Sequence, residues 1–264
     1  MADRTLQGGI KNPQNDYERE IAQLSPWFHN LHLPDGTQTA PDHPLGDFPS
    51  FKWRRISPLL PQDLTGWQVL DIGCNAGFYS FQLARRGAEV TAIDINPHYL
   101  RQAQWAGEQF GVLDRIHFRQ MQVYDLAREE QSYDLILFMG VLYHLRYPLL
   151  ALDIICRKVR RLLCLQALTF PGPEAQTAED IKIEQRDLML LPQWPKMAFI
   201  EKKLEDDPTN WWVPNDACIM AMLRSCGMSI VNRPGDEIYL CEPNERIGED
   251  QDSLEDEYLS ATGQ

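Results

Sequence analysis

The stretch Val69-Leu-Asp-Ile-Gly-Cys-Asn-Ala-Gly77 decides the fold of this chain. Its first four residues are mostly apolar, which is typical of a short buried strand. Gly73 and Gly77 then allow the backbone to turn tightly and to approach a ligand closely. A helix is predicted next, over about residues 77–86. This unit places its turn at the carboxyl end of a strand, where open α/β sheets bind ligands.

Strands and helices continue to alternate along the chain. Further strands are predicted over residues 89–94, 115–120, 133–140 and 161–170, with helices over 97–110 and 148–160. A later helix lies within 213–227, with Asn215 as its N-cap and Gly227 as its C′ residue. Two strands within 229–243 form a terminal hairpin. We therefore predict an α/β, Rossmann-like fold with a mostly parallel seven-stranded sheet and a C-terminal β-hairpin.

The segments around this sheet differ from it in composition. Residues 1–50 contain many breakers and large rings, so we expect an N-terminal extension or lid with a helix near 14–25. The main domain covers 51–242 and includes an insertion after the fifth strand, 171–212, which we expect to cap the substrate. Residues 243–264 are expected to form a solvated acidic tail.

The charge of the chain is strongly acidic. The formal net charge is −13, and residues 242–258 contain eight acids against Arg246, a balance of −7. About −6 is left on the rest of the chain. An acidic body does not favour wrapping a long nucleic acid, because phosphate contacts need lysine and arginine.

The composition also indicates the cellular compartment in which the protein is expected. No run of 18 apolar residues occurs, so no membrane span is predicted, and the polar N-terminus does not resemble a signal peptide. The six cysteines form no CxxC pair, which favours reduced thiols in a soluble, cytoplasmic protein. His29, His32 and His43 lack the spacing of metal ligands, so we predict no metal site.

The acidic residues beside the glycine turn indicate the class of ligand. A dinucleotide site needs G-x-G-x-x-G, but Asn75 stands at the second glycine position, and Asp71 would repel a pyrophosphate. A carboxylate at this place suits the ammonium and sulfonium of S-adenosylmethionine. Asp94, at the end of the second strand, has the position of an acid that accepts ribose hydroxyls. The alternative is that both acids only cap helices.

The exit of the third strand is the expected place for the adenine ring. Backbone groups of Gln122 and Val123 are candidates to contact its edge.

Two segments carry a resemblance to a known family. They are Phe138-Met-Gly-Val-Leu-Tyr-His144, followed by Arg146 and Pro148, and Phe51-Lys-Trp-Arg-Arg55, followed by Leu59, Leu60 and Leu64-Thr-Gly66. The chain resembles class I S-adenosylmethionine-dependent methyltransferases, and more narrowly the bacterial tRNA wobble-uridine carboxymethyltransferases, from about Pro26 to Gly227. The resemblance implies that the cofactor contacts Lys52, Gly73, Asp94, Ile95, Asn96, Gln122, Val123, Met139 and Tyr143.

The chain departs from that family near the cofactor. The resemblance implies that Lys52 and Tyr143 help to hold the extra carboxylate of carboxy-S-adenosylmethionine. However, a family lysine after Pro26-Trp27 is missing, Asp47 replaces a tryptophan, and the C-terminal arginine segment has no counterpart beyond Arg246. We therefore favour ordinary S-adenosylmethionine over its carboxylated form.

Candidate groups for chemistry and substrate binding lie outside the glycine turn. Tyr143 and His144 follow the fourth strand, and His144 is a candidate general base, with helix capping or core packing as the alternative. Arg54 and Arg55 are candidates to meet an anionic substrate, or else a solvated helix face. Trp211 and Trp212 are candidate walls of the substrate pocket, or else core residues.

Several functions remain open at this stage. The favoured one is methyl transfer to a hydroxyl or amine of a small molecule. The alternatives are a tRNA carboxymethyltransferase and a non-catalytic adenosyl-binding module, whereas Asp71 and Asn75 disfavour a NAD dehydrogenase. The sequence does not determine the oligomeric state.

Overall fold

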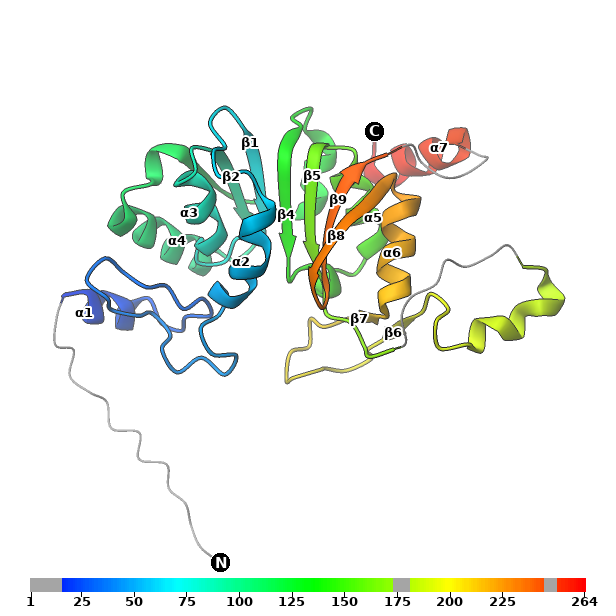
Figure 1. Cartoon of the computed structure of the whole chain (residues 1–264), viewed down its shortest axis with the longest axis horizontal. Helices are drawn as coiled ribbons and strands as arrows, with labels where there is room; N and C mark the ends of the chain where they lie inside the picture. Colours follow the sequence, from blue (N-terminus) through cyan, green and yellow to red (C-terminus); the bar gives the residue numbers. More distant parts are fainter. Residues whose placement is uncertain (1–15, 173–180, 245–250) are drawn as a thin grey trace, which may run out of the picture.

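A seven-stranded sheet with helices on both faces organises the chain in a computed structural model, which describes residues 16–172, 181–244 and 251–264. The strand order is β3-β2-β1-β4-β5-β9-β8 (Figure 1). The strands are β1 (Gln68–Ile72), β2 (Glu89–Asp94), β3 (Ile116–Gln120), β4 (Tyr133–Met139), β5 (Val159–Gln166), β8 (Met228–Gly235) and β9 (Ile238–Pro243). The first five pair in parallel, and β9 is antiparallel to both neighbours. The predicted Rossmann-like fold with a C-terminal hairpin is confirmed.

Helices cover both faces because successive residues of a strand point to opposite sides. Val69 and Leu135 pack in one core with Phe81, whereas Leu70 and Ile136 pack in the other. The α-helices of the main domain are α2 (Ser50–Ile56), α3 (Phe78–Ala84), α4 (Pro97–Phe110), α5 (Pro148–Cys156) and α6 (Asp216–Ser225). Short 3₁₀ turns are η1 (Ser57–Leu59), η2 (Leu113–Arg115), η3 (Val123–Arg128) and η4 (Leu142–His144).

Helix ends follow the local sequence. Asn96 caps α4 by accepting a hydrogen bond from the backbone of His98, and Pro97 occupies the first turn. Asn215 caps α6 by accepting from Cys218, as predicted. By contrast, α5 ends at Cys156 rather than residue 160, because Val159 already pairs with Tyr133 in the sheet.

Two added segments lie at the edge where the parallel strands end (Figure 1). The N-terminal one contains α1 (Asp16–Gln23) and packs on α4, where the side-chain amide of Gln102 donates to the carbonyl oxygens of Leu24 at 2.6 Å and Pro26 at 2.8 Å. The insertion contains η5 (Ile183–Leu190) and a small antiparallel pair, β6 (Met197–Phe199) with β7 (Trp212–Pro214). Their roles as lid and cap stay predictions.

The acidic C-terminal segment is a helix rather than a solvated tail where the structure describes it. α7 (Gln251–Thr262) packs on the domain through Tyr258, whose exposed fraction is only 9%. The guanidinium of Arg157 lies 3.7 Å from the centre of that ring and pairs with Glu255 at 2.7 Å. The expectation of a solvated tail was wrong for this part, because one aromatic residue among the acids has a core to join. Residues 245–250 of that tail lie outside the described residues.

None of the helices among the described residues is long and apolar enough to span a membrane. The six cysteines are all free thiols.

Replacing Tyr258 by alanine tests the docking of α7. Because the ring is buried, Tyr258→Ala should lower the free energy of unfolding by about 2–4 kcal/mol, as expected for a large core side chain. Urea unfolding measures it, with Tyr258→Phe as the control that keeps the ring. A change within about 0.5 kcal/mol would mean that the helix is not docked in solution.

Candidate functional site

The turn after β1 has the shape that its glycines predict. Gly73 and Gly77 have φ angles of +70° and +84°, and Asn75 also adopts a left-handed conformation at 50°. A Cβ atom on Gly77 would lie 2.6 Å from the Phe81 ring, and one on Gly73 would collide with Val141. The amide nitrogens of Gly73 and Cys74 both donate to Ile93, at 2.8 and 3.0 Å. The turn is therefore held against the end of β2.

Asp94 joins this turn to the next one. One carboxylate oxygen accepts from the backbone of Asn75 at 2.9 Å, and the other accepts from the backbone of Asn96 at 2.8 Å. Its exposed fraction is 7%, and burial raises the pKa of this carboxyl, while the backbone hydrogen bonds oppose the shift. Asn96, not Asp94, caps α4, so the helix-capping alternative does not explain Asp94. The adjacent Ile95 is 59% exposed, which leaves an apolar surface beside the carboxylate.

Asp71 lies beneath the turn rather than on it. Its exposed fraction is 1%, and it accepts a hydrogen bond from the Ser80 hydroxyl at 2.6 Å. Burial raises the pKa of Asp71 to about 7, while the Ser80 hydrogen bond opposes the shift. Because Asp71 is buried, its predicted effect on the ammonium group of the cofactor would be a longer-range electrostatic attraction and not a direct contact.

A chain of polar side chains crosses from α2 to the hairpin. Lys52 donates through Nζ to Oε1 of Gln166 at 2.8 Å, and Gln166 donates through Nε2 to Glu237 at 3.3 Å. Glu237 also accepts from the backbone of Thr169 at 2.8 Å, just after β5, which ends at Gln166 and not at residue 170 as predicted. Burial lowers the pKa of Lys52 to about 8, and the Glu237 carboxylate opposes that shift.

Tyr143 faces the same group of side chains. A Cβ atom on Gly140 would lie 3.5 Å from the Tyr143 hydroxyl and 3.6 Å from Oε1 of Gln166, so the backbone there is bare between them. Burial, followed by the charges of Glu237 and Asp207, raises the pKa of Tyr143 to about 12. The sequence analysis missed Gln166 and Glu237. The only local signal was the place of Gln166 at the carboxyl end of a strand.

The insertion is fastened to the segment after β4. The backbone of Trp211 donates to Tyr143 at 2.9 Å, and the Arg146 guanidinium lies 4.4 Å from the centre of the Trp211 ring. The indole of Trp212 donates to the carbonyl of Arg146 at 3.4 Å. Next to Tyr143, Nδ1 of His144 lies 2.9 Å from the Thr209 hydroxyl. Trp211, Trp212 and His144 therefore stand together at one wall.

The remaining predicted residues are more scattered. Met139 and Val123 are buried where β4 ends and η3 begins, and Gln122 precedes η3. Arg54 pairs with Asp47 at 3.6 Å and lines a cavity of about 290 Å³ between α2, α3 and the N-terminal segment. Arg55 lies against the backbone of Gly235. The two arginines do not converge on one point, and their contact with a substrate stays a prediction.

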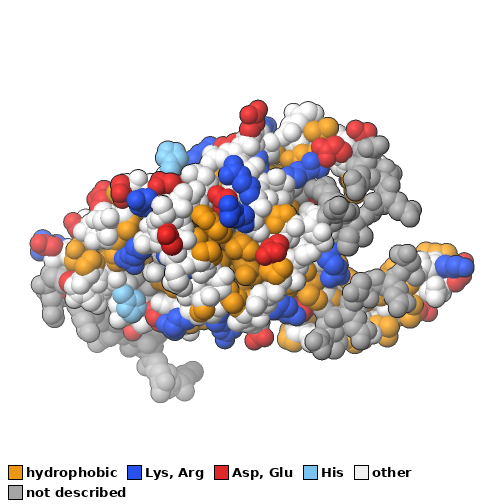
Figure 2. Space-filling view, turned by 45° about the horizontal axis from the view of Figure 1, so that its top comes forward, with side chains coloured by type: hydrophobic (Ala, Val, Ile, Leu, Met, Phe, Trp, Pro, Cys, Tyr) orange, Lys and Arg blue, Asp and Glu red, His pale blue; other side chains and the backbone are white. Residues whose placement is uncertain are grey.

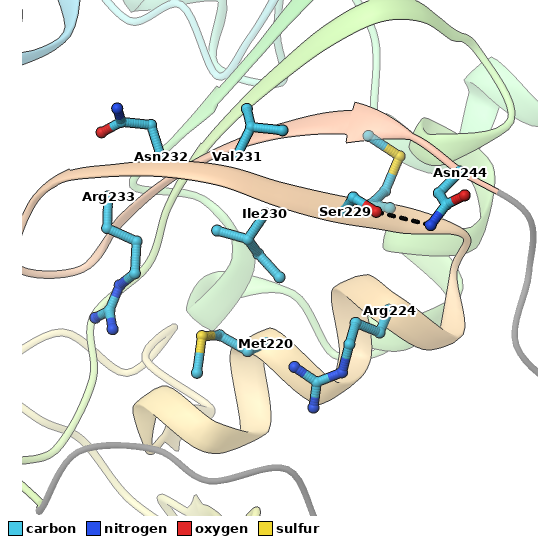
Figure 3. Close-up of a pocket in the computed structure, with 9 residues that line it drawn as sticks. Met220, Arg224, Ser229, Ile230, Val231, Asn232, Arg233 and Asn244 are labelled. Carbon is cyan, nitrogen blue, oxygen red and sulfur yellow. Dashed lines mark hydrogen bonds between the residues drawn. The ribbon is translucent and has the colours of Figure 1, made fainter.

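A shallow groove lies apart from these residues. It has a volume of about 550 Å³ and runs between α6 and β8, with Met220, Arg224, Ile230 and Arg233 among its lining (Figure 3). None of the predicted site residues lines it. The carboxyl edge of the sheet is therefore the better candidate site.

The sequence comparisons identify the class of domain. Residues 69–164 match the model of a family described as a methyltransferase domain. A tRNA U34 carboxymethyltransferase from Pseudomonas syringae pv. tomato is 33% identical over 155 residues, covering 56% of this chain and 47% of that protein. An uncharacterised protein from Synechococcus sp. is 38% identical over 119 residues, covering 41% of this chain and 28% of that protein. The chain spans about half the length, or less, of these curated relatives.

Solved structures show the same fold. The N-terminal domain of EvdMO1, with SAH bound, has a TM-score of 0.59 at 20% identity, covering 86% of this chain and 95% of that one. The [4+2]-cyclase SpnF has a TM-score of 0.51 at 16% identity, covering 81% and 67%. At these identities the likeness establishes the fold alone.

Fold and glycine turn thus define a class I, Rossmann-like domain of the kind that binds S-adenosylmethionine. Because residues 69–164 match the methyltransferase family, the chain contains an S-adenosylmethionine-dependent methyltransferase domain. The residues fit that cofactor, because a carboxylate fixed by two backbone amides stands beside the turn and the neighbouring Ile95 leaves an exposed apolar surface.

Replacing Asp71 by asparagine separates a structural role from a role in binding. The folded pKa of about 7 lies above the ordinary value of 3.8, so the folded state binds more protons between these values. Stability should therefore fall as pH rises through this window, by at most about 1.4 kcal/mol per pH unit. Asp71→Asn should remove that slope and weaken S-adenosylmethionine binding roughly tenfold, about 1.4 kcal/mol.

Urea unfolding between pH 4 and 8 and calorimetry at pH 8 measure the two effects. Ser80→Ala, which removes the hydrogen bond and keeps the carboxylate, is the matched control. Unchanged cofactor affinity in Asp71→Asn would limit Asp71 to a structural role.

Proposed function

We propose that this chain transfers the methyl group of S-adenosylmethionine to a hydroxyl or amine of a small molecule. The observation that carries this proposal is a pair of buried acidic side chains at the glycine turn that have no ion-pair partner among the described residues. Over residues 16–172, 181–244 and 251–264, neither Asp71 nor Asp94 forms an ion pair. Two buried carboxylates without a cation suit a ligand that brings positive charge.

The cofactor supplies an activated methyl group on its sulfonium, so the protein needs to align the acceptor and to remove a proton where the acceptor holds one. Asp94 is positioned to accept ribose hydroxyls, with Ile95 and Asn96 beside it. Tyr143, His144 and Trp211 form the opposite wall, where an acceptor would lie. These roles stay proposals that the geometry supports.

Glu237 supports ordinary S-adenosylmethionine over the carboxylated form. The family resemblance implies that Lys52 and Tyr143 would bind the extra carboxylate of carboxy-S-adenosylmethionine. Glu237 already places a carboxylate near this group: burial lowers the pKa of Lys52 and raises that of Tyr143, and the charge of Glu237 opposes the first shift and adds to the second. A second anion at this place would be repelled by Glu237.

The second candidate is carboxymethyl transfer to tRNA. The tRNA U34 carboxymethyltransferase from Pseudomonas syringae pv. tomato favours it, since its match covers 56% of this chain. Charge counts against it: the chain has a net charge of −13, and basic and acidic side chains are interspersed on the face seen in Figure 2. Binding of a polyanion needs a concentration of basic side chains.

Calorimetric titration of the full chain with three cofactors tests the proposal first. S-adenosylmethionine should bind at least tenfold more tightly than carboxy-S-adenosylmethionine, and NAD should not bind. Formation of S-adenosylhomocysteine is then followed over a panel of hydroxyl- and amine-bearing small molecules and unmodified tRNA. Preference for the carboxylated cofactor, with turnover of tRNA, would replace the proposal by its second candidate. Binding without any turnover would favour a non-catalytic module.

Glu237→Gln tests the reason for the cofactor preference. Glutamine can still accept the hydrogen bond from Thr169 but removes the negative charge beside Lys52. Affinity for carboxy-S-adenosylmethionine should rise roughly tenfold, about 1.4 kcal/mol, with little change for the ordinary cofactor. Glu242→Gln removes an exposed charge from β9, the strand that directly follows Glu237, and serves as the control. An unchanged ratio of affinities would show that Glu237 does not set the preference.

A further inference from the structure

A tight turn of the insertion holds an aspartate against the segment after β4. Leu204 and Asp207 exchange backbone hydrogen bonds of 3.3 and 3.1 Å. The two residues between them, Glu205 and Asp206, have φ angles of 53° and 59°, as in a type I′ turn. The side chain of Asn210 donates to the Leu204 carbonyl at 2.9 Å and is buried. The position of Asp207 is therefore fixed by its own loop.

Thr209 connects this aspartate to His144. The Thr209 hydroxyl donates to Oδ1 of Asp207 at 2.6 Å, and its backbone nitrogen donates to the same oxygen at 2.7 Å. Burial acts to raise the pKa of Asp207, but the two hydrogen bonds from Thr209 outweigh it and the pKa is lowered, so Asp207 is a carboxylate and only accepts. The single hydrogen of the Thr209 hydroxyl is therefore committed to Asp207.

The direction of the next hydrogen bond follows from this. Nδ1 of His144 lies 2.9 Å from the Thr209 hydroxyl oxygen, which has only lone pairs left to offer. Nδ1 must therefore carry the hydrogen and donate it. In a neutral imidazole the other nitrogen, Nε2, then has the free lone pair. The second oxygen of Asp207 lies 3.7 Å from Nδ1, close enough to stabilise the ring once it is protonated.

We propose that His144 is the general base of the methyl transfer, acting through Nε2, and that Thr209 and Asp207 are positioning residues that hold its ring in the Nδ1–H form. The inference rests on the proposed function and narrows the acceptor to a hydroxyl, whose proton must leave as the new bond forms. The O–H bond of the acceptor breaks and its proton goes to Nε2. The oxygen bonds to the methyl carbon, and the sulfonium becomes a thioether.

The surroundings of His144 agree with this role. Burial raises the pKa of Tyr99 on α4 and of Tyr143, and the charge of Asp207 adds to both shifts. The His144 side chain is 32% exposed, which leaves it accessible. Burial lowers the pKa of His144, while Asp207 and the hydrogen bond to Thr209 oppose the shift, so the ring is neutral and able to accept a proton near pH 7.

The experiment is histidine nitrogen NMR on the full chain labelled with ¹⁵N, with His144→Asn to identify the signals. The wild type should show a protonated Nδ1 and an unprotonated Nε2 at pH 7.5. Thr209→Val removes the hydroxyl oxygen that accepts from Nδ1, so His144 should become a mixture of the Nδ1–H and Nε2–H tautomers. Thr209→Ser keeps the hydroxyl and should retain the Nδ1–H tautomer. In Asp207→Asn the pKa of His144 should fall by roughly half a unit or more.

A wild-type ring protonated at Nε2, or a Thr209→Val spectrum identical to the wild type, would overturn the proposal. Turnover confined to amines in the acceptor panel would overturn its hydroxyl assignment. Calorimetry with S-adenosylmethionine on the same samples separates the two proposals. An Nε2–H ring in a protein that binds the cofactor contradicts only this inference, whereas loss of binding in the wild type contradicts the proposed function.

Discussion

The carboxylate of Asp94 holds the candidate site together. It accepts one hydrogen bond from Asn75 and one from Asn96, and these two amides belong to the turns that follow β1 and β2. Backbone N–H groups that leave a sheet lose their partners, and a buried one without a partner costs free energy. One side chain satisfies both amides here. The distance between the two turns therefore depends on this contact.

The other walls of the site come from segments outside the sheet. Lys52 arrives from α2, ahead of the first strand, and reaches Gln166 at the end of β5. Thr209 arrives from the insertion and reaches His144 after β4. The sheet supplies the fixed cofactor turn, while the added segments supply the groups that differ most between members of a fold. One fold can host unrelated functions because such groups are added to it, so the fold shared with SpnF, named as a cyclase, does not determine the function of this chain.

The sequence predicted what is determined locally. The glycine turn, Asp94 and the Asn215 cap depend on residues within one βαβ unit or one helix turn, so composition and spacing were sufficient. Gln166 and Glu237 were missed because their roles depend on Lys52, which is 114 residues before Gln166. Thr209 was missed likewise, 65 residues from His144. The tail was misjudged because its many acids dominate the composition, whereas a single ring, Tyr258, decides its packing.

Charge balance links the cofactor turn to the opposite wall. On the turn side, Asp71 and Asp94 are buried and without an ion pair among the described residues, and burial raises the pKa of both. On the other side, the half-buried Lys52 and the Glu237 carboxylate both hydrogen-bond to Gln166, and the charge of Glu237 opposes the burial that lowers the pKa of Lys52. The turn side therefore holds acids without a partner cation among the described residues, whereas the Lys52 side already holds a carboxylate. Under the proposed function, the two carboxylates attract a sulfonium more strongly than the neutral thioether left after transfer. The same unpaired acids that favour binding of the cofactor would then weaken the hold on its product, which helps the site to turn over.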